Sequence, residues 1–124
     1  METQKKILLV EDDIATASLL TSVLCQNNWN VSVVYSGEHA LQKIDTFVPD
    51  VVILDLLLPG MSGFDVLRKI RGEKNFKKPV VILSNLSSDR DREESFSSGA
   101  TEYLVKSAIG IKDIVQVFEK YKRT

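Results

Sequence analysis

The stretch Val51-Val52-Ile53-Leu54-Asp55-Leu56-Leu57-Leu58-Pro59-Gly60 decides how the chain folds. Four consecutive aliphatic residues lead into one aspartate, which is typical of a strand buried on both faces. Pro59-Gly60 then predicts a turn. We therefore expect Asp55 at the carboxyl end of a central strand, where an ionised carboxylate is costly unless a cation or hydrogen-bond donors meet it. The alternative is that Asp55 caps a helix, but no helical pattern follows it directly.

Short apolar runs alternate with helical patterns along the whole chain, and this alternation predicts the fold class. The predicted strands cover residues 7–10, 29–34, 51–54, 80–84 and 103–105. Five strand–helix units with short connections favour an α/β fold, a doubly wound parallel sheet flanked by five helices. The continuous runs at 7–10 and 51–54 should be central neighbours, and the weaker run near 31–34 should be an edge. The expected strand order is the flavodoxin-like 2-1-3-4-5.

The predicted helices differ in how strongly they are patterned. Ser36 and Ser62 are candidate N-caps, because each directly precedes a run with apolar residues at helical spacing. The helix near 88–98 is almost wholly polar, and Phe96 is its main apolar anchor. A helix that is polar all round is weakly held by burial, so we expect this segment to be the least stable helix.

Composition excludes several classes of protein. The 124 residues suffice for one domain with one core, and we expect a single domain over 1–124 with no output domain. The net charge of -1 gives no support for nucleic-acid binding. One cysteine, Cys25, allows no internal disulfide and fits a reducing compartment; we expect it to be a small core residue. No run approaches the length of a signal segment or membrane span, so the expected location is cytoplasmic.

The residues at the strand ends form a chemically coherent set. The predicted first strand ends in Glu11-Asp12-Asp13, the third at Asp55, the fourth at Ser84 and the fifth at Lys106. In a parallel sheet these ends share one rim, and clustered carboxylates there favour a divalent cation. Oxygen ligation with vacant positions suits Mg²⁺, which often binds together with a substrate phosphate. Lys106 and Ser84 can then hold phosphoryl oxygens, and an aspartate can form an acyl phosphate.

Three longer segments resemble the receiver domain of two-component response regulators, and the resemblance extends over essentially the whole chain. They are Ile7-Leu8-Leu9-Val10-Glu11-Asp12-Asp13, Asp55-Leu56-Leu57-Leu58-Pro59-Gly60-Met61-Ser62-Gly63, and Gly99-Ala100-Thr101-Glu102-Tyr103-Leu104-Val105-Lys106. The resemblance implies a cytoplasmic signalling switch that takes a phosphoryl group from the phosphohistidine of a sensor histidine kinase or phosphotransfer protein. It also implies a change on the surface of the fourth helix, fifth strand and fifth helix, where a homodimer can form. Direct nucleic-acid or membrane binding by this chain is not expected.

The resemblance assigns roles that the pattern alone left open among the three acids. It implies Asp55 as the phosphate acceptor, with Lys106 and Ser84 as its catalytic neighbours. The metal ligands it implies for Mg²⁺ are Glu11, Asp12, Asp55 and the backbone carbonyl of Leu57. Asp13 then becomes the cap of the first helix. Ser84 and Tyr103 match the switch residues, although Tyr103 can also be read as an ordinary edge-strand aromatic.

The chain departs from the family pattern at two positions. Ser107 stands where the family usually has proline, often after a cis bond, and a cis bond before a non-proline residue costs about 3–4 kcal/mol. Asn85 stands where the family usually has a small residue, and it can crowd the pocket. Neither change removes a catalytic group.

Two leucines predict a long-lived phosphorylated form. Leu57 and Leu86 flank the expected path of the water that attacks the phosphoaspartate, and neither can orient that water. We therefore expect slow self-dephosphorylation.

Three alternatives remain at this point. A receiver-like interaction module without phosphate chemistry conflicts with the complete set of acids, serine and lysine. A flavin carrier on the same sheet conflicts with acids where the cofactor phosphate would lie. A haloacid-dehalogenase-type phosphatase needs a second aspartate where Leu57 stands.

Overall fold

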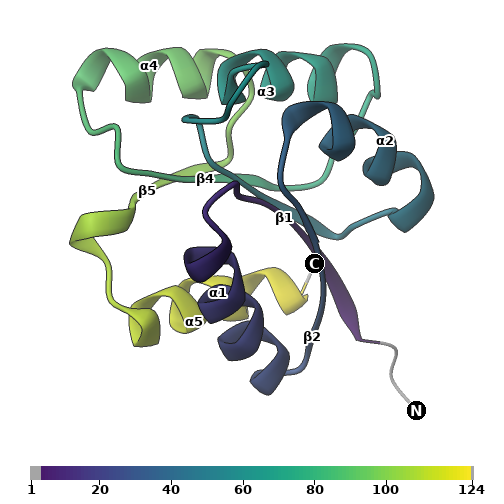
Figure 1. The fold of residues 1–124 in the computed structure, drawn as a ribbon, viewed down its shortest axis with the longest axis vertical. Helices are drawn as coiled ribbons and strands as arrows, with labels where there is room; N and C mark the ends of the chain where they lie inside the picture. Colours follow the sequence, from purple (N-terminus) through teal and green to yellow (C-terminus); the bar gives the residue numbers. More distant parts are fainter. Residues whose placement is uncertain (1–3, 124) are drawn as a thin grey trace.

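The five predicted strands form one parallel sheet in the order β2-β1-β3-β4-β5, as expected (Figure 1). The computed structural model describes residues 4–123. Its strands are β1 (Lys5–Val10), β2 (Trp29–Val34), β3 (Val51–Leu54), β4 (Val80–Ser84) and β5 (Glu102–Val105). The central pair is fixed by a parallel register that sets Val10 beside Leu54. All four residues of β3 are buried, which confirms the interpretation of this run as a strand covered on both faces.

Helices cover both faces of the sheet, with α1 and α5 on one side and α2, α3 and α4 on the other (Figure 1). Their bounds are α1 (Ile14–Gln26), α2 (Gly37–Phe47), α3 (Gly63–Gly72), α4 (Asp89–Ser97) and α5 (Ile111–Glu119). Strand residues alternate between two cores, so that Ile7 packs with α1 and α5 whereas Leu8 packs with α2 and α3. None of the helices within residues 4–123 is long and apolar enough to cross a membrane.

Side-chain caps fix where the helices begin. Asp13, Ser36 and Ser62 each accept a hydrogen bond from the backbone N–H three residues later, which confirms the predicted caps. Ser88 caps α4 in the same way. Behind Ser62, a Cβ on Gly63 would lie 2.3 Å from the carbonyl oxygen of Asp55. Glycine is therefore needed here for α3 to begin directly against the end of β3.

Two predictions about side-chain burial are wrong. Phe96 is 49% exposed and does not anchor α4; the buried residue of that helix is Ser95. Cys25 is exposed, and Leu24 holds the core position instead. In both cases the preceding residue, which lies about 100° around the helix, faces the sheet. Trp29, at the start of β2, is 2% exposed and packs in the core formed with α1 and α5.

Candidate functional site

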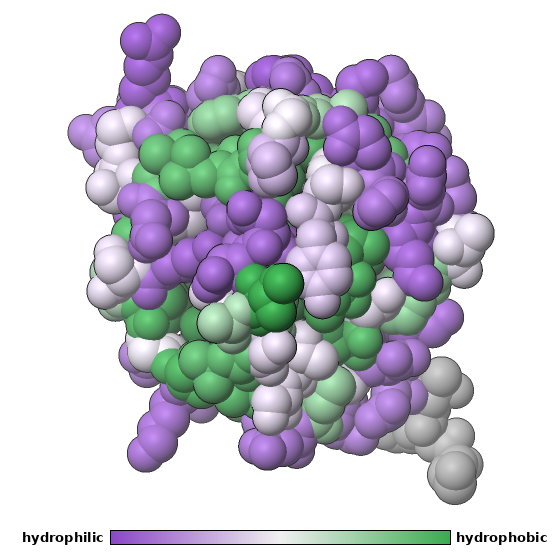
Figure 2. All heavy atoms as spheres, viewed as in Figure 1, coloured by the Kyte–Doolittle hydropathy of each residue, from purple (hydrophilic) through white to green (hydrophobic). Residues whose placement is uncertain are grey.

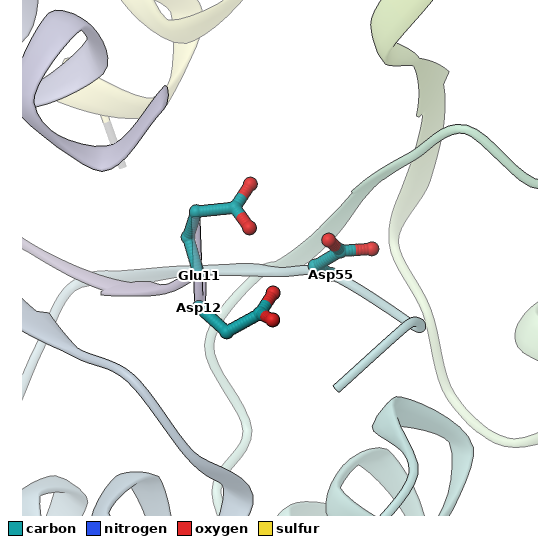
Figure 3. Close-up of side chains that lie close together, drawn as sticks. All are labelled: Glu11, Asp12 and Asp55. Atoms are coloured by element: carbon teal, nitrogen blue, oxygen red, sulfur yellow. The ribbon is translucent and has the colours of Figure 1, made fainter. Parts of the chain in front are cut away.

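Three carboxylates meet where β1 and β3 end (Figure 3). The backbone holds them there: the N–H of Glu11 donates to the Val34 carbonyl, and the N–H of Asp55 donates to the Val10 carbonyl, each at 3.1 Å. One carboxylate oxygen from each of Glu11, Asp12 and Asp55 lies within 4.8 Å of the others. Asp12 is exposed, but Glu11 and Asp55 are only 2% and 5% exposed. The two buried charges therefore need a cation.

Lys106 supplies a cation to these two carboxylates. It lies at the start of a 3-10 turn (Lys106–Ala108) directly after β5. Its Nζ donates to Oδ2 of Asp55 at 2.8 Å and also forms an ion pair with Glu11. Burial alone would lower the pKa of Lys106, but hydrogen bonds to Asp55 and Glu11 outweigh it and raise that pKa. Lys106 therefore stays charged and neutralises part of the acidic cluster.

The acidic cluster fits a hard divalent cation. Burial raises the pKa of Glu11, although the interaction with Lys106 opposes this rise. The ionised carboxylate of Glu11 is therefore less well stabilised in the site than it would be in water. Three converging carboxylates with one side open to solvent are the oxygen ligands that Mg²⁺ prefers. Leu57 lies beside them, and its N–H donates to Oδ1 of Asp55 at 3.0 Å. That bond helps to orient the Asp55 carboxylate, while ligation by the Leu57 carbonyl stays a prediction.

Ser84 and Tyr103 both form a hydrogen bond with Leu86, in the loop after β4. Ser84 is fully buried at the end of β4, and its hydroxyl accepts the Leu86 N–H at 3.4 Å. The Tyr103 hydroxyl donates to the Leu86 carbonyl at 2.7 Å, and its ring is 6% exposed. Burial raises the pKa of Tyr103. Leu86 thus connects the two predicted switch residues through its own backbone.

Two contacts near the site were not predicted from the sequence. The guanidinium of Arg92, on α4, lies 5.0 Å from the centre of the Tyr103 ring. Asn85 accepts the Ser107 N–H at 3.1 Å, so the two positions that depart from the family pattern are hydrogen-bonded to each other. The Lys106–Ser107 peptide bond is trans. In the space-filling view, polar side chains lie near the middle of this face with hydrophobic ones around them (Figure 2).

Comparison with known sequences gives a consistent result. The family model for the response regulator receiver domain matches residues 7–119. The DNA-binding response regulator MtrA of Mycobacterium tuberculosis is 37% identical over 107 residues, which are 86% of this chain and 46% of MtrA. The response regulator ArlR of Staphylococcus aureus is 36% identical over 101 residues, 82% of this chain and 45% of ArlR. The chain therefore spans about half the length of these relatives.

Solved structures agree with the sequences. The BeF3-activated N-terminal receiver domain of RstA from Klebsiella pneumoniae has a TM-score of 0.89 and 31% identity, over 97% of this chain and 100% of the other. The receiver domain of the Francisella response regulator 1452 has a TM-score of 0.86 and 32% identity, over 96% of this chain and 98% of the other.

Proposed function

The chain belongs to the family of response regulator receiver domains, and we propose that it acts there as a switch phosphorylated on Asp55. One observation carries the proposal. Asp55 as a residue is 5% exposed, and its carboxylate is bonded to Lys106 at 2.8 Å and within reach of Glu11 and Asp12. A buried carboxylate with one ammonium, a second buried acid and a third acid that is exposed to solvent is suited to attack phosphorus beside a cation. We also propose residues 1–124 as one receiver domain.

The proposed reaction is a phosphoryl transfer from a phosphohistidine on a sensor histidine kinase or phosphotransfer protein, in the cytoplasm. A carboxylate oxygen of Asp55 forms the new bond to phosphorus, and the bond from phosphorus to the imidazole nitrogen breaks. The electron pair of that bond stays on the imidazole, which takes a proton from solvent. Lys106 then moves its charge from the Asp55 carboxylate to the phosphoryl oxygens, and the Ser84 hydroxyl donates to another of them.

The donor set supports Mg²⁺ as the cofactor. Its proposed ligands are the carboxylates of Glu11, Asp12 and Asp55 and the backbone carbonyl of Leu57. When bound, Mg²⁺ would neutralise charge on the phosphoryl oxygens during transfer. Glu11 would exchange part of its interaction with Lys106 for the metal, which frees the ammonium to follow the phosphoryl group.

The proposed output is a change in the surface made by α4, β5 and α5, where a homodimer can also form. Two features of α4 support this choice. Its one buried residue is Ser95, whose hydroxyl has no hydrogen-bond partner among the described residues. Its Arg92 contacts Tyr103, whose hydroxyl is bonded to the loop that follows Ser84. An element so weakly held is the one that a small change near Ser84 can shift.

The proposed lifetime of the phosphorylated form is long. Leu57 is 53% exposed beside Asp55, and Leu86 packs partly buried against the core formed with α2 and α3. Neither side chain has a donor or acceptor that can orient a water molecule toward phosphorus.

A small phosphodonor tests the proposal without knowledge of the kinase. The protein is incubated with acetyl phosphate and either Mg²⁺ or a chelator, and intact mass is followed over time. We expect one added phosphoryl group with Mg²⁺ and a far slower reaction with the chelator. If the mass stays unchanged under both conditions, the proposed function is wrong and a phosphate-independent interaction module becomes the better interpretation.

A further inference from the structure

The turn that carries Lys106 has no cap of its own. The 3-10 turn Lys106–Ala108 begins after Val105, and no side chain at that boundary caps its first N–H groups. Such groups need an acceptor from elsewhere or from water. The acceptor for the Ser107 N–H is Oδ1 of Asn85, at 3.1 Å and 22 residues away in sequence. A side chain from the loop after β4 therefore caps the turn after β5.

Strand register explains why these two residues meet. β4 and β5 run parallel, and their last rung sets Ser84 beside Val105. The next residue on one strand is Asn85, and Ser107 lies two residues beyond Val105. The Asn85 side chain thus extends the connection between the two strands past the point where backbone pairing ends.

The same loop is bonded to β5 at a second point. Leu86, directly after Asn85, accepts the Tyr103 hydroxyl at 2.7 Å. Ser84, directly before it, is fully buried at the site. The segment from Ser84 to Leu86 is therefore held to β5 and to the turn after it by two separate bonds. A shift of this segment toward the site would take the Lys106 turn with it.

We propose that Asn85 is a positioning residue for Lys106, holding its turn in register with Ser84 so that both groups reach a phosphoryl group on Asp55 together. The inference deepens the proposed function and rests on it. Asn85 acts through the Ser107 N–H, and its side chain is exposed. An exposed hydrogen bond is at the weak end of the usual range, which corresponds to about a two- to fivefold effect on an equilibrium.

Four variants separate this bond from the bulk of the side chain. Asn85→Ala removes both, and Asn85→Leu removes the acceptor while keeping a branched side chain with the same number of heavy atoms. Ser107→Pro removes the donor, because proline has no N–H. Ser107→Ala keeps the N–H and is the matched control.

The first measurement is amide hydrogen exchange at Ser107 in the metal-free protein. We expect this amide to exchange about two- to fivefold faster in Asn85→Ala and Asn85→Leu than in the parent. Unchanged exchange in both variants would show that Asn85 does not hold the turn. This readout does not depend on phosphorylation.

The second measurement is the affinity for beryllofluoride, a phosphoryl mimic, at saturating Mg²⁺, with the affinity for Mg²⁺ alone as the reference. Asn85→Ala and Asn85→Leu should each weaken beryllofluoride binding about two- to fivefold and leave Mg²⁺ affinity unchanged. Ser107→Ala should behave as the parent. In the Ser107→Pro background, Asn85→Ala should not change beryllofluoride affinity, because proline has no N–H that could donate to the Asn85 side chain.

The outcomes are distinguishable. The positioning role would be overturned if Asn85→Ala weakened beryllofluoride binding equally in the parent and in the Ser107→Pro background. It would also be overturned if Asn85→Ala weakened this binding and Asn85→Leu did not. If the parent itself does not bind beryllofluoride, the proposed function fails, and the exchange measurement still decides whether the bond forms.

Discussion

Replacing Lys106 by methionine removes the cation that the buried carboxylates share. Glu11 and Asp55 have side chains 2% and 6% exposed, and Lys106 is 18% exposed. Removing one partner of a buried charge pair costs about 3–5 kcal/mol, and the open side of this site at Asp12 lets water offset part of it. We expect Lys106→Met to lower the free energy of unfolding by about 2–4 kcal/mol at pH 7.5 without Mg²⁺. For a domain of this size the melting temperature should fall by about 6–15 °C.

The effect of pH follows from Glu11, whose pKa is raised by burial against the pull of Lys106. A carboxyl whose pKa is raised in the folded state holds its proton more tightly there than in the unfolded chain. The free energy of unfolding therefore falls as pH rises from the unfolded-state pKa through the folded-state pKa. Removing Lys106 removes a group that lowers the Glu11 pKa. The deficit of Lys106→Met should therefore be smallest in acid, grow as pH rises, and level off once Glu11 is ionised in both proteins.

Chemical denaturation across a pH series, with and without Mg²⁺, measures this deficit. The matched control is Lys69→Met, because Lys69 pairs with Glu73 at 3.6 Å with both side chains well exposed, 41% and 64%. That variant should stay within about 0.5 kcal/mol of the parent. If Lys106→Met costs no more than Lys69→Met, the two carboxylates do not depend on Lys106 and the electrostatic account of the site is wrong.

Three further predictions concern the metal, the lifetime and the output. Mg²⁺ should raise the melting temperature of the parent by mass action, and Asp12→Asn should abolish most of that rise; an equal rise in both would exclude Asp12 as a ligand. Leu57→Asn and Leu86→Glu, singly and together, should shorten the half-life of the phosphoform about tenfold, equivalent to about 1.4 kcal/mol of barrier, as followed by mass after the donor is removed. A double variant that decays as slowly as the parent would contradict this. Hydrogen exchange with and without beryllofluoride should change most in α4 and β5, and changes confined to α1 and α2 would refute the proposed output surface.

The sheet order and the meeting of the three acids could be predicted from the sequence because both depend on where the strands lie and end. A continuous apolar run that stops at Asp55 locates that residue to within one position, and parallel strands bring their carboxyl ends to one rim. Physical reasoning alone did not choose among the three acids after β1. The resemblance to receiver domains assigned Glu11 and Asp12 to the metal and Asp13 to the cap of the first helix. The hydrogen bond from the Thr16 N–H to the Asp13 side chain agrees with the assignment of Asp13.

Helix faces were harder to predict. One residue is about 100° around a helix, so Phe96 and Cys25 point away from the sheet although their neighbours Ser95 and Leu24 face it. In α4 almost every residue is polar, and no apolar stripe indicates the inner face. The Asn85–Ser107 bond was beyond prediction for another reason: it joins two loops, and its geometry depends on the register of β4 and β5.

Mapping the phosphorylated residue decides directly whether Asp55 is the phosphate acceptor. After incubation with acetyl phosphate and Mg²⁺, borohydride reduction marks the acyl phosphate, and peptide mass spectrometry locates the mark. We expect a single modified residue, Asp55, and no modification in Asp55→Asn. A mark on Glu11 or Asp12 in the parent, or an equally modified Asp55→Asn protein, would contradict it.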